Sequence, residues 1–291
     1  MTTTLTPPGP PPLSPGGRTA ARAALVITAV AVIAITLALL TAAAVGLSAF
    51  RLVTDHRDLP ANLRALTVET ASSPMAVRIV SDRDATTPRV DVRMVTTDRN
   101  DREELTVTTE ASGTLLRVDA PSSFLAWGDP GELTVTVPPE LGRQLAVTVR
   151  QDNGVLIAEA DLDQLTATTT TDGTVLLRGT VRRIEVRARD GEIHTRQPIS
   201  VGESFTAETR DGDVQVRFAD APPQIEATTR DGDIDLALPT PGPYLVRAQS
   251  DDGSAAVRVP QTTDSARAAA TVTATTRDGE ISVDTLRSIG R

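Results

Sequence analysis

The sequence contains no cysteine, its basic residues are all arginine, and aromatic residues make up only 2% of its 291 residues. The absence of cysteine excludes disulfides, thiolate metal sites and a cysteine nucleophile. Because aromatic side chains are scarce, any core has to be built from small and β-branched residues, which favours thin β-sheets. The length allows one large domain or two modest ones.

Acidic residues outnumber basic ones in most of the chain. The formal net charge is −9, and residues 1–59 contribute +2 from four arginines and two aspartates, which leaves −11 for residues 60–291. An acidic surface repels phosphate backbones, and the sequence has neither a basic stripe nor a row of aromatic residues. The composition therefore predicts that the protein does not bind nucleic acid.

The N-terminal residues predict a tail and a membrane anchor. Residues 1–22 begin with MTTTLTPPGPPPLSPGG, a proline-rich stretch without charge that predicts a disordered tail. Residues 23–50 contain no charge, and as a helix these 28 residues would span roughly 40 Å, enough for one transmembrane helix. A cleaved signal peptide is the alternative, because Ala42 and Ala44 form an A-x-A pattern. Arginines before the span predict a single-pass cell-membrane protein with a cytoplasmic N-terminus and an extracytoplasmic C-terminal domain.

After the predicted span the hydropathy pattern changes. Residues 51–62 predict a short polar linker, in which Pro60 opposes a continued helix. Across residues 63–288 apolar residues alternate with polar ones, for example Leu66 with Val68 and Val77 with Ile79. No window in this part has a helical period, so the pattern predicts an all-β domain.

This domain contains an internal repeat centred on an Asp-Gly or Asn-Gly pair. The spacings between successive glycines are 19, 18, 21, 20, 21 and 26 residues, and the glycines are Gly154, Gly173, Gly191, Gly212, Gly232, Gly253 and Gly279. The residues two positions after them are apolar: Leu156, Val175, Ile193, Val214, Ile234, Ala255 and Ile281. The residues five positions before them form a second column: Val149, Thr168, Val186, Ala207, Ala227, Ala248 and Ala274. Each unit is therefore predicted to be a strand, a turn and a strand with one face inward.

Two architectures fit this repeat. In a β-solenoid each unit is one coil, and equivalent columns stack about 4.8 Å apart. In a meander, Asp-Gly forms the type I′ turn of a two-residue hairpin, and Arg210 faces Asp213 across it. Alternation alone leaves both open, because both place the same residues inward. The regular period of about twenty residues favours the β-solenoid, or β-helix-like, fold.

The segments TRDGDVQVRF, TRDGDIDLAL and TRDGEISV follow an N-terminal apolar run. In this order the sequence resembles the bacterial putative adhesin family of β-strand repeats, domain of unknown function 4097, over residues 65–286. The resemblance implies a membrane-anchored β-solenoid exposed in the cell envelope. It implies no catalytic residue and no particular ligand.

The acidic turns are candidates for binding Ca²⁺, because stacked copies would place carboxylates in a ladder. The candidates are Asp211, Asp213, Asp231, Asp233 and Asp278. The nine-residue repeat of Ca²⁺-binding β-rolls is absent, however. The favoured interpretation is structural: Asp and Gly form the turns, and Arg189, Arg210, Arg230 and Arg277 neutralise the acidic ladder. We therefore predict no metal and no cofactor.

Catalysis has little support in the sequence. The two histidines are His56, in the predicted linker, and His194, on the outward side of a predicted strand, and no G-x-S-x-G turn presents a serine. The prediction is a non-enzymatic envelope protein that adheres to cell-wall polymer or to an envelope partner. A regulatory or sensory subunit is the alternative, and deletion of residues 1–17 would impair only that function. A glycan-active β-helix enzyme that uses outward carboxylate pairs is the second alternative.

Overall fold

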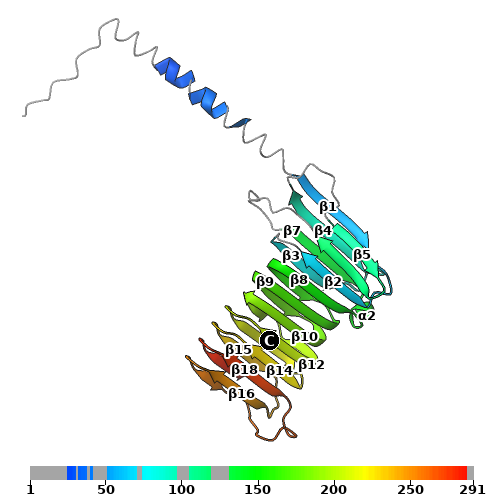
Figure 1. Ribbon diagram of the computed structural model, residues 1–291, viewed down its shortest axis with the longest axis vertical. Coiled ribbons are helices and arrows are strands. Elements are labelled where there is room, and N and C mark those ends of the chain that lie inside the picture. Colours follow the sequence, from blue (N-terminus) through cyan, green and yellow to red (C-terminus); the bar gives the residue numbers. More distant parts are fainter. Residues whose placement is uncertain are drawn as a thin grey trace, which may run out of the picture. The chain divides into compact units, whose positions relative to one another are not determined.

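The structure is a computed structural model that describes residues 25–30, 32–37, 40–41, 51–70, 74–96, 105–118 and 131–286. The chain forms two compact units, Met1–Arg51 and Leu52–Arg291. In the first unit, residues 25–30 and 32–37 are helical with exposed side chains (Figure 1). None of the helices in the described ranges is long and apolar enough to cross a membrane. The predicted tail lies outside the described residues, and the predicted span lies partly outside them, so both stay predictions.

In its described residues the second unit is built almost entirely of strands, with one short helix, α2 (Pro139–Gly142). Its N-terminal strands are β1 (Arg51–Asp58), β2 (Ala65–Thr70), β3 (Met75–Ser81), β4 (Arg89–Thr96), β5 (Leu105–Glu110), β6 (Gly113–Val118) and β7 (Gly131–Val137). Its central strands are β8 (Ala146–Glu159), β9 (Leu162–Arg178), β10 (Thr180–Asp190), β11 (Ile193–Thr195), β12 (Ile199–Glu208) and β13 (Val214–Asp220). Its C-terminal strands are β14 (Gln224–Thr228), β15 (Ile234–Leu238), β16 (Leu245–Ser250), β17 (Ala255–Val257), β18 (Thr271–Thr276) and β19 (Ile281–Thr285).

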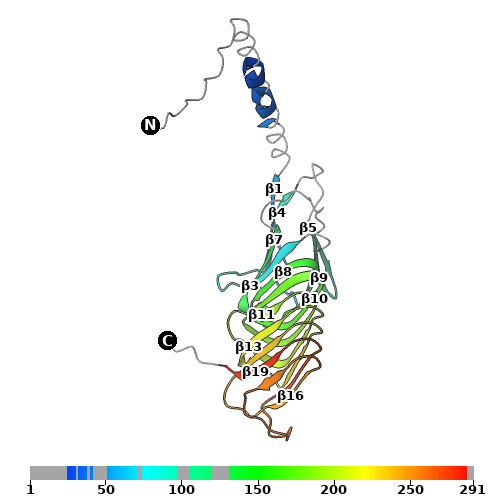
Figure 2. The ribbon, with the colours of Figure 1, turned by 90° about the vertical axis from the view of Figure 1, so that its left-hand side faces the viewer.

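The repeat units stack as coils of a β-solenoid, as predicted. One series of strands pairs in parallel in the order β8, β9, β10, β12, β14, β18 and β16. A second series pairs in parallel in the order β9, β11, β13, β15, β19 and β17. Figure 2 shows the strands stacked coil upon coil. Hairpins would pair neighbouring strands antiparallel, so the meander is excluded for these coils.

The inward columns form a thin core of small side chains. The column two residues after each glycine is confirmed except in the terminal coil. Val214 pairs with Ile193 and with Ile234, whereas Ala255 pairs with Ile281 but is exposed. The alanine column is confirmed with one correction: Val149 pairs with Ala167, and Thr168 faces outward. The reason is a register shift between Gln151 and Asn153, because one extra residue moves a side chain to the opposite face of a strand.

The core also holds two of the few aromatic residues. Phe205 on β12 and Phe218 on β13 are fully buried, with ring centroids 5.3 Å apart and ring planes at 85°. An edge-to-face pair of this kind fills the space between two strands of one coil better than small residues alone.

The two ends of the solenoid depart from the regular repeat. At the N-terminal end, β4 pairs antiparallel with β7, and β5 pairs antiparallel with β6. Most of the predicted linker is strand β1, which pairs with β4. At the C-terminal end, the coil formed by β18 and β19 lies between the coil of β14 and β15 and the coil of β16 and β17. The terminal coil is therefore β16 and β17, although β18 and β19 come last in the sequence.

Candidate binding surface

The Arg-Asp-Gly turns stack directly on one another along one corner of the solenoid. At Gly212, where φ is +150°, an added Cβ would lie 2.2 Å from the carbonyl oxygen of Gly191, so only glycine fits. The threonines three residues before Gly212, Gly232 and Gly279 point inward and are buried. Thr229 donates its hydroxyl to the carbonyl oxygen of Gly212 at 3.1 Å, and Thr276 donates to Gly232 at 3.0 Å. The Thr-Arg-Asp-Gly motif is therefore a stacking motif.

Three of the predicted Ca²⁺ candidates lie side by side in these turns. Asp211 pairs with Asp231, and Asp231 pairs with Asp278, in parallel bridges. Arg230 donates to the carboxylates of Asp211 and Asp231, both at 2.9 Å. A hydrogen bond with Asp231 raises the pKa of Asp211 and of Asp278, whereas the Arg230 guanidinium lowers the pKa of Asp231. The three carboxyl groups therefore do not ionise independently.

The other two candidates belong to a separate ladder. Asp213 accepts a hydrogen bond from the backbone N–H of Asp233 at 2.9 Å, and Asp233 accepts one from the N–H of Glu280 at 2.8 Å. These carboxylates satisfy backbone donors of the next coil. Across the described ranges, no group of three or more His, Asp or Glu side chains is placed to hold a metal ion.

The predicted neutralisation of the ladder by four arginines is seen at Arg230 alone. Among the described residues, Arg189, Arg210 and Arg277 form no ion pair. Arg189 and Arg210 instead line a hollow beside the turns, on the outer face of the coils. Two of the arginines expected to be structural are thus available to solvent and to a ligand.

Two adjoining hollows form a surface that we call the Arg–Thr groove. Their volumes are about 370 and 270 Å³, and they share Thr170. The groove crosses successive strands, because its lining comes from β2, β6, β8, β9, β10 and β12 and from the residues that follow them. The lining residues are Glu69, Thr70, Arg117, Arg150, Gln151, Asp152, Thr168, Thr169, Thr170, Arg187, Ala188, Arg189, Glu208, Thr209 and Arg210.

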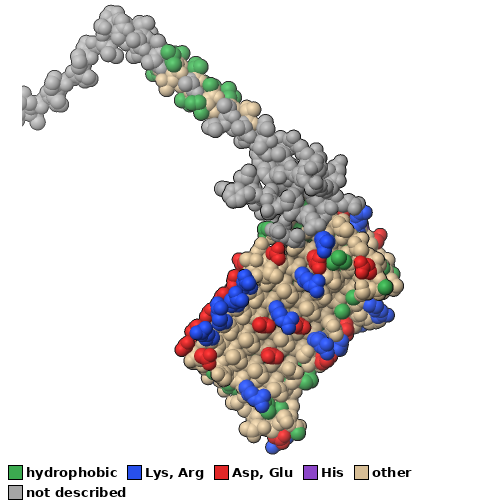
Figure 3. Space-filling model, viewed as in Figure 1, with side chains coloured by type: hydrophobic (Ala, Val, Ile, Leu, Met, Phe, Trp, Pro, Cys, Tyr) green, Lys and Arg blue, Asp and Glu red, His purple; other side chains and the backbone are tan. Residues whose placement is uncertain are grey.

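The Arg–Thr groove has the opposite charge to the rest of the solenoid. Its lining contains five arginines and three carboxylates. At one end, Glu69 accepts hydrogen bonds from Arg117 at 2.7 Å and Arg150 at 3.1 Å, and the Arg117 bond lowers the pKa of Glu69. The other end holds Arg189 and Arg210 without a carboxylate partner among the described residues. The groove therefore presents arginines and hydroxyl groups in a domain that is otherwise acidic. On the face of the solenoid drawn in Figure 3, arginine and carboxylate side chains lie interspersed.

The model of the family described as Toastrack DUF4097 matches residues 155–286. We call this matched range the Toastrack residues. The resemblance predicted from the repeat is therefore confirmed over this range. The Toastrack residues include the stacked turns and the part of the Arg–Thr groove that β9, β10 and β12 line.

Several crystal structures are similar to the chain at low identity. A "putative adhesin" from Parabacteroides merdae has 9% identity and a TM-score of 0.49, over 80% of this chain and 96% of that chain. A "putative adhesin" from Bacteroides fragilis has 12% identity and a TM-score of 0.46, over 81% and 97%. A "putative lipid binding protein" from Parabacteroides distasonis has 14% identity and a TM-score of 0.34, over 80% and 97%. These names describe those proteins and not this chain. No curated protein matches the chain.

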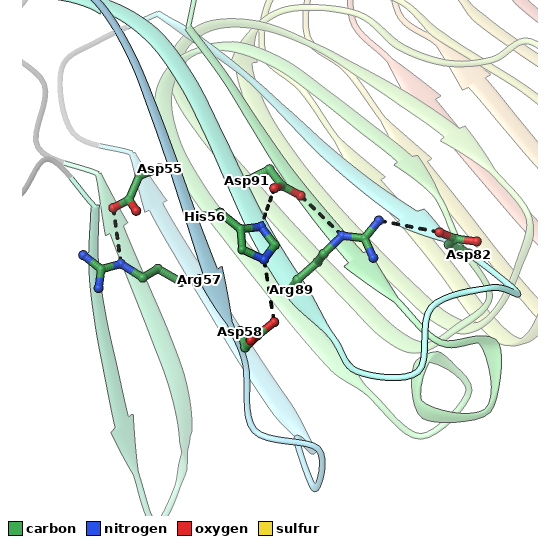
Figure 4. A network of polar contacts seen from close by, with 7 residues as sticks. All are labelled: Asp55, His56, Arg57, Asp58, Asp82, Arg89 and Asp91. Atoms are coloured by element: carbon green, nitrogen blue, oxygen red, sulfur yellow. Dashed lines mark hydrogen bonds and ion pairs between the residues drawn. The ribbon is translucent and has the colours of Figure 1, made fainter.

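His56 lies before the Toastrack residues, on β1, in a network of charged side chains (Figure 4). Its Nδ1 atom is 2.6 Å from Asp91, and its Nε2 atom is 3.7 Å from Asp58. Arg89 lies between Asp91 and Asp82, 3.6 Å from each. A Ser-His-Asp arrangement needs one ring nitrogen beside a hydroxyl, but both nitrogens of His56 face carboxylates. The network joins β1 to β4 and forms no nucleophilic site.

His194 lies in the Toastrack domain, on the outward side of β11, as predicted. Its nearest charged partner is Glu192, 3.8 Å from Nδ1. A lone histidine beside one carboxylate on an open strand does not complete a catalytic arrangement.

One buried polar residue was not predicted from the sequence. Gln151 on β8 points inward and is only 3% exposed, and neither atom of its amide has a hydrogen-bond partner. Its neighbour Thr70 on β2 is 4% exposed, and its hydroxyl also lacks a partner. In the later coils the equivalent threonines bond to a glycine carbonyl. The first coils thus depart from the stacking motif directly beneath the Arg–Thr groove.

Proposed function

We propose that this chain is a non-enzymatic envelope protein whose solenoid binds cell-wall polymer along the Arg–Thr groove. The observation that supports this most directly is the groove itself, which crosses the coils with arginine and threonine side chains on an acidic domain. A linear polymer that carries hydroxyl and anionic groups complements this lining.

The dimensions of the groove also support a polymer. Parallel strands lie about 4.8 Å apart, so the six successive strands that line the groove extend it to roughly 24 Å. Small-molecule sites are enclosed and largely apolar, whereas both hollows are open and lined by polar residues. Repeated weak contacts along one chain add up to useful avidity.

We further propose that residues 23–50 anchor the protein in the cell membrane, with the N-terminus cytoplasmic and the solenoid in the envelope. The uncharged run of 28 residues supports this proposal. An anchored solenoid would hold the membrane close to the polymer that the groove binds.

The test is co-sedimentation of the full chain, kept in mild detergent, with isolated cell-wall polymer. We expect saturable pelleting that weakens with salt, because exposed charges are screened. Replacement of Arg189 and Arg210 by alanine should reduce pelleting several-fold. Arg217→Ala is the matched control, because Arg217 is also exposed and has no ion pair in the described residues, but lies on β13, outside the groove.

Two outcomes would overturn the proposal. Absence of pelleting would favour an envelope protein as the partner, and an equal loss in the control variant would remove the groove as the binding surface. Pelleting should also survive chelation of Ca²⁺, because Asp213 and Asp233 already accept backbone hydrogen bonds. Loss of binding on chelation would make the acidic turns the binding site instead.

A further inference from the structure

The terminal coil of the solenoid has an open edge. Within the described residues β16 pairs with β18 and β17 pairs with β19, and no strand lies on their other side. Leu245 donates its N–H to the carbonyl of Ala270, on the β18 side. Because successive residues of a strand direct their backbone groups to opposite sides, Val246, Ala248 and Ser250 direct theirs to the open side.

The chain covers only the beginning of this edge. Tyr244 donates its N–H to Pro260 at 2.8 Å and accepts one from Thr262 at 2.9 Å. The covering segment then leaves the edge, and a hollow of about 540 Å³ follows, lined by residues 245–247 and 261–263. Beyond Tyr244 the backbone of β16 is therefore open to pairing.

The open end also leaves part of the core uncovered. Val246, Ala248 and Val257 pack against the core but are only partly buried, whereas the equivalent residues of the preceding coil, Val272, Ala274 and Val283, are buried. These side chains lie on both strands of the coil. A single extended peptide would cover one strand, whereas a coil of the same cross-section would cover both strands and the apolar residues between them.

We propose that the open end binds a second copy of this chain, end to end, with β16 antiparallel to β16 of the second copy. Charge complementarity supports this occupant. Arg247 is exposed and has no ion pair in the part of the chain that the structure describes. In the register that centres the twofold axis on Gln249, Arg247 lies opposite Asp251 of the second copy, and the pair occurs twice. In the register centred on Arg247 itself, like charges meet.

The backbone supports the same register. With the axis at Gln249, Ala248 lies opposite Ser250 of the second copy, and both residues direct their backbone groups to the open side. They can therefore exchange both N–H···O bonds, as a hydrogen-bonded antiparallel pair does. A twofold axis centred on another odd-numbered residue of β16 would also bring the backbone groups of the open side opposite each other. Only the axis at Gln249 places Arg247 opposite a carboxylate.

The second strand of the coil fits the same axis. Gln249 is three residues before Asp252, and Ala256 is three residues after Gly253, so we expect the two residues to lie across the coil from each other. With the axis through Ala256, residues 255 and 257 pair with each other across the interface. Because Ile281 donates its N–H to Ser254, Ala255 and Val257 direct their backbone groups to the open side. One twofold axis thus serves both strands.

The absence of cysteine from the chain provides a direct test. In the proposed dimer Gln249 faces itself as a non-hydrogen-bonded pair, for which Cα atoms lie about 4.5 Å apart, within disulfide range. Gln249→Cys in the full chain should form a covalent dimer under mild oxidation. Gln224→Cys is the matched control, because Gln224 is exposed on β14, which is paired on both sides. Equal cross-linking of the two variants would overturn the proposal.

A charge exchange tests the register without a disulfide. Arg247→Asp places two pairs of aspartates at the interface and should weaken dimerisation on the order of tenfold. Adding Asp251→Arg to the same chain should restore it. Sedimentation equilibrium measures the dimer, and circular dichroism checks that each variant is folded. A folded double variant that stays as weak as the single one would overturn the pairing. Polymer binding does not enter this experiment, so its outcome is independent of the proposed function.

Discussion

Replacement of Gly212 by alanine tests whether the repeated turn is a stacking motif. The backbone at Gly212 has φ +150°, and an alanine Cβ there would lie 2.2 Å from the carbonyl oxygen of Gly191. The obstacle is a backbone atom of the preceding coil, so no side-chain rotation can relieve it. The two coils have to separate locally, or the turn has to change its conformation.

The magnitude follows from three contributions. An unfavourable positive φ costs an alanine about 1–3 kcal/mol. Separation of the two coils also weakens two hydrogen bonds that join them, from the N–H of Gly191 to the carbonyl of Asp211 and from the N–H of Asp211 to the carbonyl of Arg189. At about 1 kcal/mol each, the total loss is about 3–5 kcal/mol, which is a large part of the stability of an ordinary domain.

The assay is denaturant unfolding of the full chain, followed by circular dichroism. Gly202→Ala is the matched control, because the nearest atom to its added Cβ is the Cα of Arg182 at an ordinary 3.6 Å. The control variant should leave the denaturant concentration at the midpoint of unfolding almost unchanged. In Gly212→Ala, hydrogen exchange should show faster exchange of the backbone amides in the coils on either side of the turn. Equal midpoints for the two variants would refute the stacking argument.

Two further predictions concern the first coils. Gln151→Met should raise the free energy of unfolding by about 1–2 kcal/mol, because it removes a buried amide without hydrogen-bond partners, whereas Gln164→Met, at a less buried outward position, should have little effect in the same denaturation assay. The lowered pKa of Glu69 means that its ion pairs stabilise the fold above the ordinary pKa of glutamate and that this contribution is lost as the pH falls through the lowered value. Glu69→Gln should therefore lower the melting temperature at neutral pH and approach the parent protein in acid. Glu110→Gln is the matched control, because Glu110 is exposed and has no ion pair among the described residues. The same loss of melting temperature at every pH in Glu69→Gln would contradict the assignment.

Much of the candidate surface was not predictable from the sequence. The pattern predicted that the arginines before each Asp-Gly pair would neutralise the acidic ladder, but Arg189 and Arg210 line the groove instead. Their roles depend on the neighbouring coil, which the local sequence does not specify. The register shift after Gln151 is similar, because it moves Thr168 outward through a change in how two strands pair.

The sequence by itself determined the all-β class, the strand-turn-strand unit and most of the inward columns, because side-chain alternation and the need for glycine in the turn are local properties of the backbone. Tertiary structure decided that the units stack in parallel, that the coil of β18 and β19 lies between the coil of β14 and β15 and the terminal coil, and that arginines and threonines from several strands form one groove. These features depend on which strands pair. Pairing joins residues far apart in the chain, and the same alternating pattern is compatible with more than one arrangement.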